Sequence, residues 1–410
     1  MSNTMGGVPT STGIGAPGTA PAPANLSRSP MSAQPSAAAA IPFTRGSTLA
    51  TMADAKLSAS QLTAGTTTQV QLQTNAFLES LILDVTASVP STNSATVVFA
   101  ADAPFSVISQ IKLDDPAGQS IIAPITGFQL FTLNKYLPDT DCDFDPCRDP
   151  NYSVITGSGA TGGGFSFRLV VPIEYRRRDA LGALNNSAAN QRYLLTITTI
   201  AAYSSLYTTS PTAVPTGIAI NVYQQYWTSP PASITTSAGS SPVQATPSGL
   251  GTVAFVRYER HNEVSGGGQP QIQLNNVGDV VQTIIWTLRD SSNVRDATDW
   301  PTEFDWWVND FQVHALSAND WQRWTARFYG LFGASTAKPT AGSLDNGVYP
   351  MFQFGALFDS AGNFGPANQL LPTDATTKLQ VRGSTWGASA SYLEVLTRMI
   401  RPVSGAALYA

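Results

Sequence analysis

The sequence predicts an all-β chain: two tandem eight-stranded jelly rolls (β-sandwiches), each with an inserted short helix, after a flexible N-terminal arm. Apolar and polar residues alternate along most runs after residue 65, as in strands covered on one face. Gly, Pro and Asn separate these runs, and the order of strands, one helix and more strands occurs twice. Each unit has about 150 residues, a usual domain size, and a jelly roll leaves few exposed strand edges.

Residues 1–65 form the predicted arm. The first 44 residues are mainly Ala, Pro, Ser, Gly and Thr, with Arg28 as their single charge. This composition buries too little apolar surface to offset chain entropy, which favours a flexible segment. Residues 45–62 contain apolar residues at helical spacing and predict a short amphipathic helix. The residues at this spacing are Leu49, Met52, Ala53 and Lys56.

Residues 66–228 form the first predicted jelly roll. Its clearest alternating runs are TTTQVQLQT, FSVISQIKL and FSFRLVVPI. One segment breaks the alternation: TGFQLFTLNKYL, at 126–137, places leucines at i, i+3 and i+7 and stops at Pro138. Helical spacing inside a β-rich unit predicts a helix packed on a sheet.

Residues 229–251 are rich in Pro, Ser, Thr and Gly and predict a linker. The second jelly roll is expected at 252–403, followed by a C-terminal tail at 404–410. Its alternating strands are interrupted once, by SANDWQRWTARFYGL, where Ser317 and Asp320 have capping-box spacing. The apolar stripe of this predicted helix consists of Trp321, Trp324, Phe328 and Leu331.

The chain carries little charge. Its 22 basic and 27 acidic residues give a net charge of −5, and charged residues make up 12% of the sequence, against about 25% in ordinary domains. A hydroxyl-rich surface of this kind repels copies of itself weakly and suits self-assembly. Without a basic excess, no direct nucleic-acid binding is expected. A signal peptide and a membrane-length apolar run are absent from the sequence, so synthesis is expected in a cytoplasm.

The most polar stretch is DTDCDFDPCRDP at 139–150, which holds both cysteines, Cys142 and Cys147. Its alternating Asp residues resemble a calcium loop, but such a loop needs Gly at its sixth position and Glu at its twelfth. Counted from Asp139, these positions hold Phe144 and Pro150. We therefore interpret the stretch as a polar loop, expect no metal or cofactor, and leave open whether the two cysteines pair.

Other candidate sites have competing structural interpretations. The glycine runs at 157–164 and 265–270 lack a following Lys-Ser/Thr and favour loops over phosphate cradles. His261 and His314 have no third ligand at metal spacing. Five tryptophans lie near three acidic residues, a set that suits either glycan stacking with paired carboxylates or a packed core, and we favour the core. The set comprises Trp300, Trp306, Trp307, Trp321 and Trp324, with Asp299, Glu303 and Asp305.

In order and spacing, the segments of both halves resemble the major capsid proteins of tectivirus-type phages. In the first half the matching run is FLESLILDVTASV, FSVISQIKLDDPAGQ, GFQLFTLNKYL, GGFSFRLVVPIEYRRRDALGAL and NQRYLLTITT. In the second half it is TIIWTLRDSSN, WQRWTARF, DNGVYPMFQFG and YLEVLTRMI. The DDPAGQ turn and the VPIEY strand are the most specific pieces. The long Ala/Pro arm departs from the family, whose N-terminus is shorter and richer in Gln.

The resemblance implies a homotrimer of double-barrel subunits, which forms a pseudo-hexagonal block that tiles an icosahedral shell. It also implies a virion location, contacts with neighbouring trimers, vertex (penton) and minor capsid proteins, and an internal membrane around double-stranded DNA. The barrels of the family stand upright on that membrane, with the N-terminal segment toward it. A phage spike or carbohydrate-binding β-sandwich is the alternative. An enzyme is disfavoured because the sequence offers no coherent catalytic set.

Two groups of basic residues are candidate contacts in such an assembly. The N-terminal group, Arg28, Arg45 and Lys56, gives the arm a slight basic bias that suits anionic lipid. The second group, Arg176, Arg177 and Arg178, follows a predicted strand in YRRRDALGAL and suits acidic residues of a neighbouring subunit. Solvent exposure without a partner is the simpler interpretation of both groups.

Overall fold

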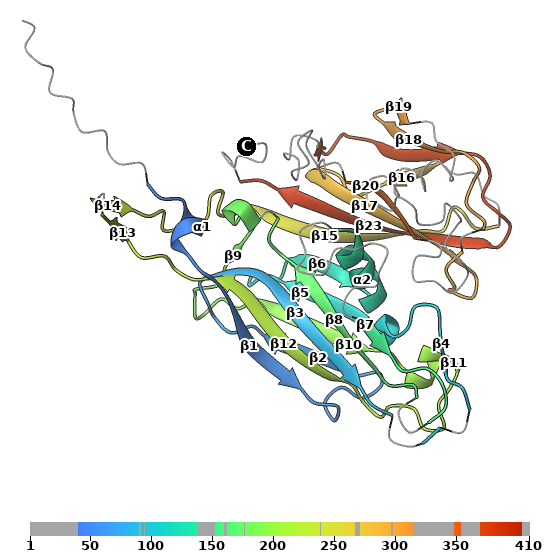
Figure 1. The fold of residues 1–410 in the computed structure, drawn as a ribbon. Coiled ribbons are helices and arrows are strands. Elements are labelled where there is room, and N and C mark those ends of the chain that lie inside the picture. The colour runs from blue at the N-terminus through green and yellow to red at the C-terminus, as the bar shows by residue number, and fades with distance from the viewer. Residues whose placement is uncertain are drawn as a thin grey trace, which may run out of the picture. The chain divides into compact units, whose positions relative to one another are not determined.

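The computed structural model describes two β-sandwiches in succession (Figure 1). The described residues are 40–403 except for 90–91, 94, 138–151, 160–161, 176, 238, 267–270, 297, 315–347 and 354–369. The acidic stretch at 139–150 with its two cysteines, Arg28, Arg176 and the predicted helix after Ser317 therefore lie outside the described residues. Residues 1–39 of the predicted arm and the C-terminal tail at 404–410 lie outside them as well.

The first sandwich has the strand order of a jelly roll. One sheet has the order β1-β12-β3-β8-β7, with β9 also paired to β3, and the facing strands have the order β2-β10-β5-β6. Strands that follow one another in the sequence mostly lie in different sheets, as they do in a jelly roll. The strands of the two sheets are β1 (Leu49–Leu57), β2 (Thr67–Gln71), β3 (Phe77–Ala87), β5 (Ile108–Asp114), β6 (Ser120–Ile125), β7 (Tyr152–Val154), β8 (Phe165–Pro172), β9 (Leu184–Asn185), β10 (Leu194–Thr199) and β12 (Ala219–Trp227).

The helix predicted over residues 45–62 is wrong. Only α1 (Phe43–Gly46) is helical there, and β1 follows it as an edge strand paired antiparallel with β12. A register shift between Ala53 and Ala55 breaks the alternation of β1, so its side chains do not follow a period of two. The first jelly roll therefore begins at Leu49 rather than at residue 66, and β1 completes its set of eight principal strands.

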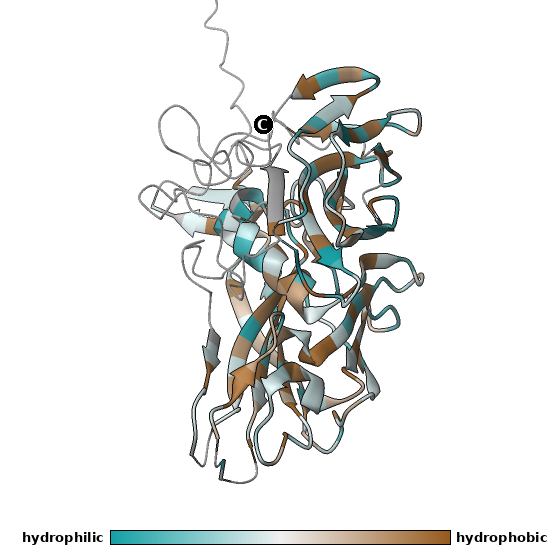
Figure 2. Ribbon diagram, turned by 90° about the vertical axis from the view of Figure 1, so that its right-hand side faces the viewer, coloured by the Kyte–Doolittle hydropathy of each residue, from teal (hydrophilic) through white to brown (hydrophobic). Residues whose placement is uncertain are grey.

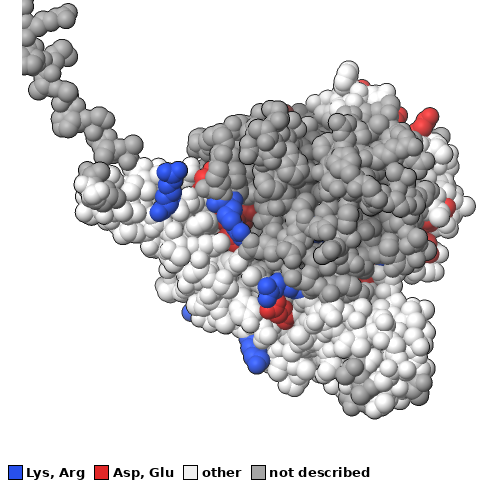
Figure 3. All heavy atoms as spheres, in the orientation of Figure 1, with Lys and Arg blue, Asp and Glu red and all other residues white. Residues whose placement is uncertain are grey.

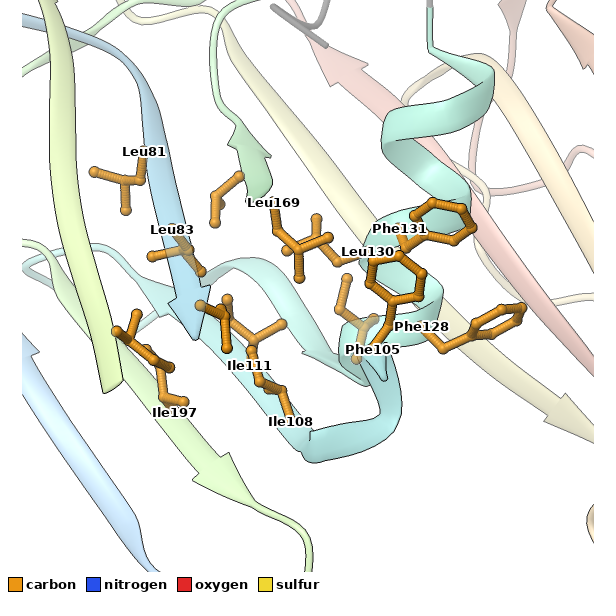
Figure 4. Close-up of a cluster of buried hydrophobic side chains, with 14 of the residues drawn as sticks. Leu81, Leu83, Phe105, Ile108, Ile111, Phe128, Leu130, Phe131, Leu169 and Ile197 are labelled. Carbon is orange, nitrogen blue, oxygen red and sulfur yellow. The ribbon is translucent and has the colours of Figure 1, made fainter. Parts of the chain in front are cut away.

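The helix predicted at 126–137 is confirmed as α2 (Gly127–Tyr136). Thr126 and Gln129 form a capping box: the Thr126 hydroxyl accepts from the Gln129 backbone N–H at 3.1 Å, and the Gln129 carboxamide accepts from the Thr126 N–H at 2.8 Å. Every residue of α2 is buried. Its side chains extend the core of the first roll, where Phe131 stacks on Phe105 with ring centroids 3.9 Å apart (Figure 4).

The second sandwich repeats the same strand order. The order β15-β23-β17-β20 forms one layer, with β21 also paired to β17, and β16-β22-β18-β19 forms the other. These orders match those of the eight principal strands of the first roll, which confirms the predicted tandem fold; β7 is an addition to the first roll. Its strands are β15 (Val253–His261), β16 (Ile272–Leu274), β17 (Val280–Asp290), β18 (Phe304–Val308), β19 (Phe311–His314), β20 (Val348–Gln353), β21 (Leu371–Pro372), β22 (Leu379–Gly383) and β23 (Ala390–Arg401).

One sheet belongs to both rolls. Strand β6 of the first roll pairs in parallel with β15 of the second through Ile122 and Val256, which joins four strands of one roll to those of the other. Each roll still has its own apolar core, and Val256, Ile285 and Leu396 of the second roll join the first cluster. Figure 2 shows brown and paler residues alternating along strands, the pattern that one-sided burial requires.

Smaller elements connect these layers. The short elements of the first roll are β4 (Val98–Phe99), β11 (Tyr207–Thr209) and the 3₁₀ turns η1 (Phe105–Val107), η2 (Arg177–Asp179) and η3 (Tyr203–Leu206). In the predicted linker, β13 (Ser233–Thr236) and β14 (Gly239–Pro242) form a separate two-stranded hairpin. The segment between the rolls is therefore partly ordered into strands.

Candidate assembly surfaces

The point where the chain enters the first roll is fixed by Phe43 in α1. Its side chain is 1% exposed and packs edge-on against Phe77 and Trp227, with centroid distances of 5.2 and 6.3 Å. The backbone of Ile41 donates to Pro242 and accepts from Gln244 at 2.8 and 2.9 Å, so the β13–β14 hairpin holds the same segment. We call residues 41–46 the arm root. The arm root is therefore packed against the edge of the first roll.

Replacing Phe43 with alanine is expected to release the arm root. Removing a buried Phe costs about 3 to 5 kcal/mol, and 3 kcal/mol corresponds to roughly a hundredfold higher population of the open form. Arg45 is exposed on α1, so trypsin cleavage after Arg45 reports this opening. We expect cleavage to accelerate by up to about 100-fold. Phe311→Ala, at a side chain that is 73% exposed, should leave the rate unchanged.

The basic residues predicted from the sequence do not form one patch. Arg45 lies in the arm root, and α1 contacts η2, which contains Arg177 and the backbone of Arg178. Lys56 is exposed near the opposite end of β1, roughly 23 Å from Leu49 at 3.3 Å per residue. Arg45 and Arg177 therefore share one end of the first roll, while Lys56 does not belong to this group.

Arg177 has a partner within its own chain. Its guanidinium lies 2.6 Å from the Glu79 carboxylate, which is buried on β3 and also accepts from the Ser80 hydroxyl at 2.5 Å. That Arg177 also meets an acidic residue of another subunit stays a prediction. Its side chain is 40% exposed, so part of the guanidinium faces outward beside this internal pair.

A second buried carboxyl group, Glu174, lies beside this pair. Burial, followed by repulsion from Glu79, raises the pKa of Glu174 to about 9, although a hydrogen bond from Trp227 opposes the shift. The Trp227 indole donates to Glu174 Oε2 at 3.0 Å, and Arg398 of β23 donates to the Glu174 backbone carbonyl at 2.7 Å. At neutral pH the Glu174 side chain is therefore protonated. It connects the arm root, through Trp227, to the second roll.

A cluster of charges, which we call the inter-roll clamp, joins the rolls at another point. Asp102, in the turn before η1, receives Arg289 at 2.8 Å and Arg295 at 2.6 Å through its two carboxylate oxygens. These arginine side chains are 4% and 1% exposed. Arg289 also lies 2.8 Å from Glu394, and Arg295 lies over the ring of Phe128 at 4.6 Å. One first-roll carboxylate thus pairs with two buried second-roll arginines, and Glu394 adds a second negative charge beside Arg289.

Electrostatic balance keeps the clamp charged. Burial disfavours the charged form of Arg289, but attraction from Asp102 and Glu394 outweighs it and raises the pKa of Arg289 above its usual range. Two further contacts cross the same seam: Arg295 donates to the Ala101 carbonyl at 2.6 Å, and Arg257 donates to the Ser120 carbonyl at 2.8 Å. The rolls are therefore held together by paired charges and a shared sheet.

The tryptophans of the second roll are mainly core residues. Trp300 and Trp306 pack in its apolar cluster with Phe304, which confirms the core interpretation for these two. Trp307 is half-buried, and Arg382 lies over its ring at 4.3 Å. Asp299 accepts from the backbone N–H of Ser389 at 2.7 Å, so its carboxylate holds the segment that leads into β23. The described part of this set therefore gives no open stacking face, and Trp321 and Trp324 lie outside it.

Of the two candidate histidines, His261 is the one whose side chain lies in the described part of the chain. His261 is buried, and its ring lies 3.2 Å from Glu259, whose carboxylate accepts from two backbone N–H groups. Among the described residues, no group of three or more His, Cys, Asp or Glu side chains is arranged to hold a metal ion. No helix in this part is long and apolar enough to cross a bilayer.

On the face drawn in Figure 3, little of the described surface is charged. In the view of Figure 3, white spheres dominate this area, and the few blue and red groups are small and scattered. The sequence composition anticipated this property. It did not reveal the clamp, because Asp102 lies 187 positions before Arg289. The available signal was Arg289 itself, a charge that ends the apolar run VVQTIIWTLRD.

Solved structures with a similar fold come from viral shells. The major capsid protein of Sulfolobus turreted icosahedral virus aligns over 88% of this chain and 98% of its own, with a TM-score of 0.55 and 14% identity. A subunit of the PBCV-1 virus capsid aligns over 88% and 95%, with a TM-score of 0.55 and 9% identity. The Faustovirus major capsid protein aligns over 87% and 90%, with a TM-score of 0.51 and 10% identity.

At these identities the likeness is one of fold. The sequence matches no protein-family model and no curated protein. The alignments cover both rolls, and they agree with the tandem strand orders described above. The resemblance suspected from the order of sequence segments is thus supported by an independent comparison of structures. The chain has the double jelly-roll fold found in these viral major capsid proteins.

Proposed function

We propose that this chain is a viral major capsid protein whose homotrimers are pseudo-hexameric blocks that tile an icosahedral shell. The observation that carries the proposal is the pair of complete rolls with identical strand order, joined in one sheet. A trimer of this chain contains six similar rolls around one axis, so its outline is approximately hexagonal. Hexagonal units pack without gaps in a lattice. The likeness to capsid subunits from three viruses supports the same role.

The burial within each roll and the contacts between the rolls suit a protein with a structural role. Each roll buries its own apolar core, worth about 25 cal/mol per Å² of apolar surface removed from water. The inter-roll clamp and the shared sheet then oppose relative movement of the two rolls, as a stiff block requires. A weakly charged surface lets many blocks come together without strong mutual repulsion. Neighbouring trimers, vertex (penton) proteins and minor capsid proteins are the proposed partners in the virion.

We further propose that the end bearing the arm root faces an internal membrane around double-stranded DNA. Arg45 and Arg177 lie at this end, and Arg28, Arg176 and Arg178 are adjacent to them in the sequence or precede them on the arm. Each basic residue near an anionic bilayer contributes about 1 kcal/mol. Lys56 lies at the other end of β1 and is not part of this proposal. Synthesis in the host cytoplasm precedes assembly into the virion.

Light scattering on the purified full-length chain tests the trimer. Three chains of 43.3 kDa give an expected mass of about 130 kDa. Mass should be measured after size-exclusion chromatography at several protein concentrations, so that a weak complex is recognised by a concentration-dependent mass. A stable particle of 43.3 kDa that binds glycans would refute the capsid proposal and favour the spike or carbohydrate-binding alternative.

A further inference from the structure

The β13–β14 hairpin is an isolated element. It forms its own two-stranded sheet, and Figure 1 shows it beside α1 and apart from the sandwich sheets. The side chains of Ser233, Thr235 and Ser240 are exposed. The Ile234 side chain is partly buried. A lone hairpin is only marginally stable in water. Its base is nevertheless fixed, because Val243 donates to Ala232 at 3.0 Å and Ile41 donates to Pro242.

The hairpin also lacks charge altogether. Residues 228–251 contain no Asp, Glu, Lys, Arg or His, although charged side chains are the usual protection of exposed strands against pairing. Other edges of the described fold carry such protection: β1 has Asp54 and Lys56 together with its register shift. The exposed, neutral, hydroxyl-rich hairpin therefore has the properties of a surface that is covered in an assembly.

A groove of about 780 Å³ lies between the two rolls on the same chain. First-roll residues of the β5–β6 turn and of the segment before β10 form one wall, and Val253, Phe255 and Arg401 form the other. Carboxamide side chains are prominent in its lining. They belong to Gln71, Gln119, Asn185, Asn190 and Gln191.

Two of the three charged residues that line this groove have partners within the chain, and the third, Arg192, is exposed. Arg401 lies 2.9 Å from Asp279, and the Asp115 carboxylate accepts from the backbone N–H groups of Ala117 and Gln119 at 2.9 and 2.7 Å. What remains for a ligand is Arg192 and a row of neutral amides beside the rings of Tyr193 and Phe255. The Arg192 guanidinium can donate to hydroxyl and backbone carbonyl oxygens of a hairpin that carries no charge. Carboxamides donate and accept, as do the Ser and Thr hydroxyls of the hairpin, so the two surfaces match chemically.

We propose that the β13–β14 hairpin of one copy seats in the inter-roll groove of the next copy. No hairpin residue lines the groove of its own chain, so hairpin and groove are two different surfaces. A contact between different surfaces of identical chains is head-to-tail, and such a contact closes into a ring when its rotation fits. This inference rests on the proposed trimer and assigns the surfaces that would close it.

Cysteine cross-linking in the full chain tests this contact. Ala117 is an exposed groove residue and Ser240 is an exposed hairpin residue, so each can carry a new thiol. In a background with Cys142→Ser and Cys147→Ser, the A117C/S240C protein is treated with a short bismaleimide and run on a denaturing gel. We expect covalent dimers and trimers up to about 130 kDa, three times 43.3 kDa, and no larger species.

The matched control moves the groove thiol to Ala59, which is also exposed but does not line the groove. A59C/S240C should remain at the monomer position. Equal cross-linking in both proteins, a ladder extending beyond the trimer, or an unlinked A117C/S240C protein that is trimeric by light scattering would each overturn the contact. A monomer by light scattering would instead remove the proposed function on which the contact depends.

Discussion

Asp102→Ala is expected to lower the free energy of unfolding by about 3 to 5 kcal/mol, because it leaves two buried arginines without their shared carboxylate. Glu394 still faces Arg289, and Arg295 still donates to the Ala101 carbonyl, but both buried side chains lose a carboxylate within 2.8 Å. Chemical denaturation followed by circular dichroism measures the change. If the seam between the rolls loosens first, the transition should also broaden or divide into two steps.

An ion pair on the surface provides the control for this prediction. Arg168 and Asp84 form a two-point contact at 2.6 and 2.9 Å, but the arginine side chain is 45% exposed. Asp84→Ala should cost less than about 1 kcal/mol, because solvent screens an exposed pair. Equal losses in the two variants would show that the clamp does not hold the rolls together.

Glu174→Gln is expected to stabilise the protein increasingly as the pH rises. The folded-state pKa of Glu174 is about 9, against an ordinary value of 4.5, so between these values the folded chain binds a proton that the unfolded chain has released. The contribution of Glu174 is therefore fully present below pH 4.5 and is lost as the pH rises toward 9. The slope of the unfolding free energy approaches about 1.4 kcal/mol per pH unit, the limit for one proton.

Unfolding free energies at pH 5, 7 and 9 test this dependence. Glutamine keeps an oxygen that can accept from the Trp227 indole but does not ionise, so the stability gap between variant and wild type should widen with pH. Glu303→Gln, at an exposed acidic residue, should give a gap close to zero at all three values. A gap for Glu174→Gln that stays constant with pH would mean that this carboxyl group ionises normally in the folded chain.

The strand-rich halves and α2 were predictable because their patterns are local. Period-two runs such as FSFRLVVPI became β8, and the leucine spacing before Pro138 became α2. The segment at 45–62 was mistaken for a helix because its partner β12 lies about 170 positions later, and no local pattern reports that pairing. The register shift beside Asp54 also removed the alternation that would have marked β1 as a strand.

The candidate surfaces were less predictable. The sequence indicates which residues are basic but not which of them lie close together. Arg45 and Arg177 lie on α1 and η2, which contact each other although they are more than 130 positions apart in the sequence. The clamp and the inter-roll groove both combine residues from the two halves of the chain. Such sites depend on how the rolls pack, which no spacing within one half records.

The single sheet that contains β6 and β15 makes the two halves poor candidates for separate expression. A gene cut in the segment between them would leave each product with an open strand edge, and the second would also carry Arg289 and Arg295 without Asp102. Any ancestor that arose by fusing two single-roll genes therefore acquired a dependence that later division of the gene could not undo.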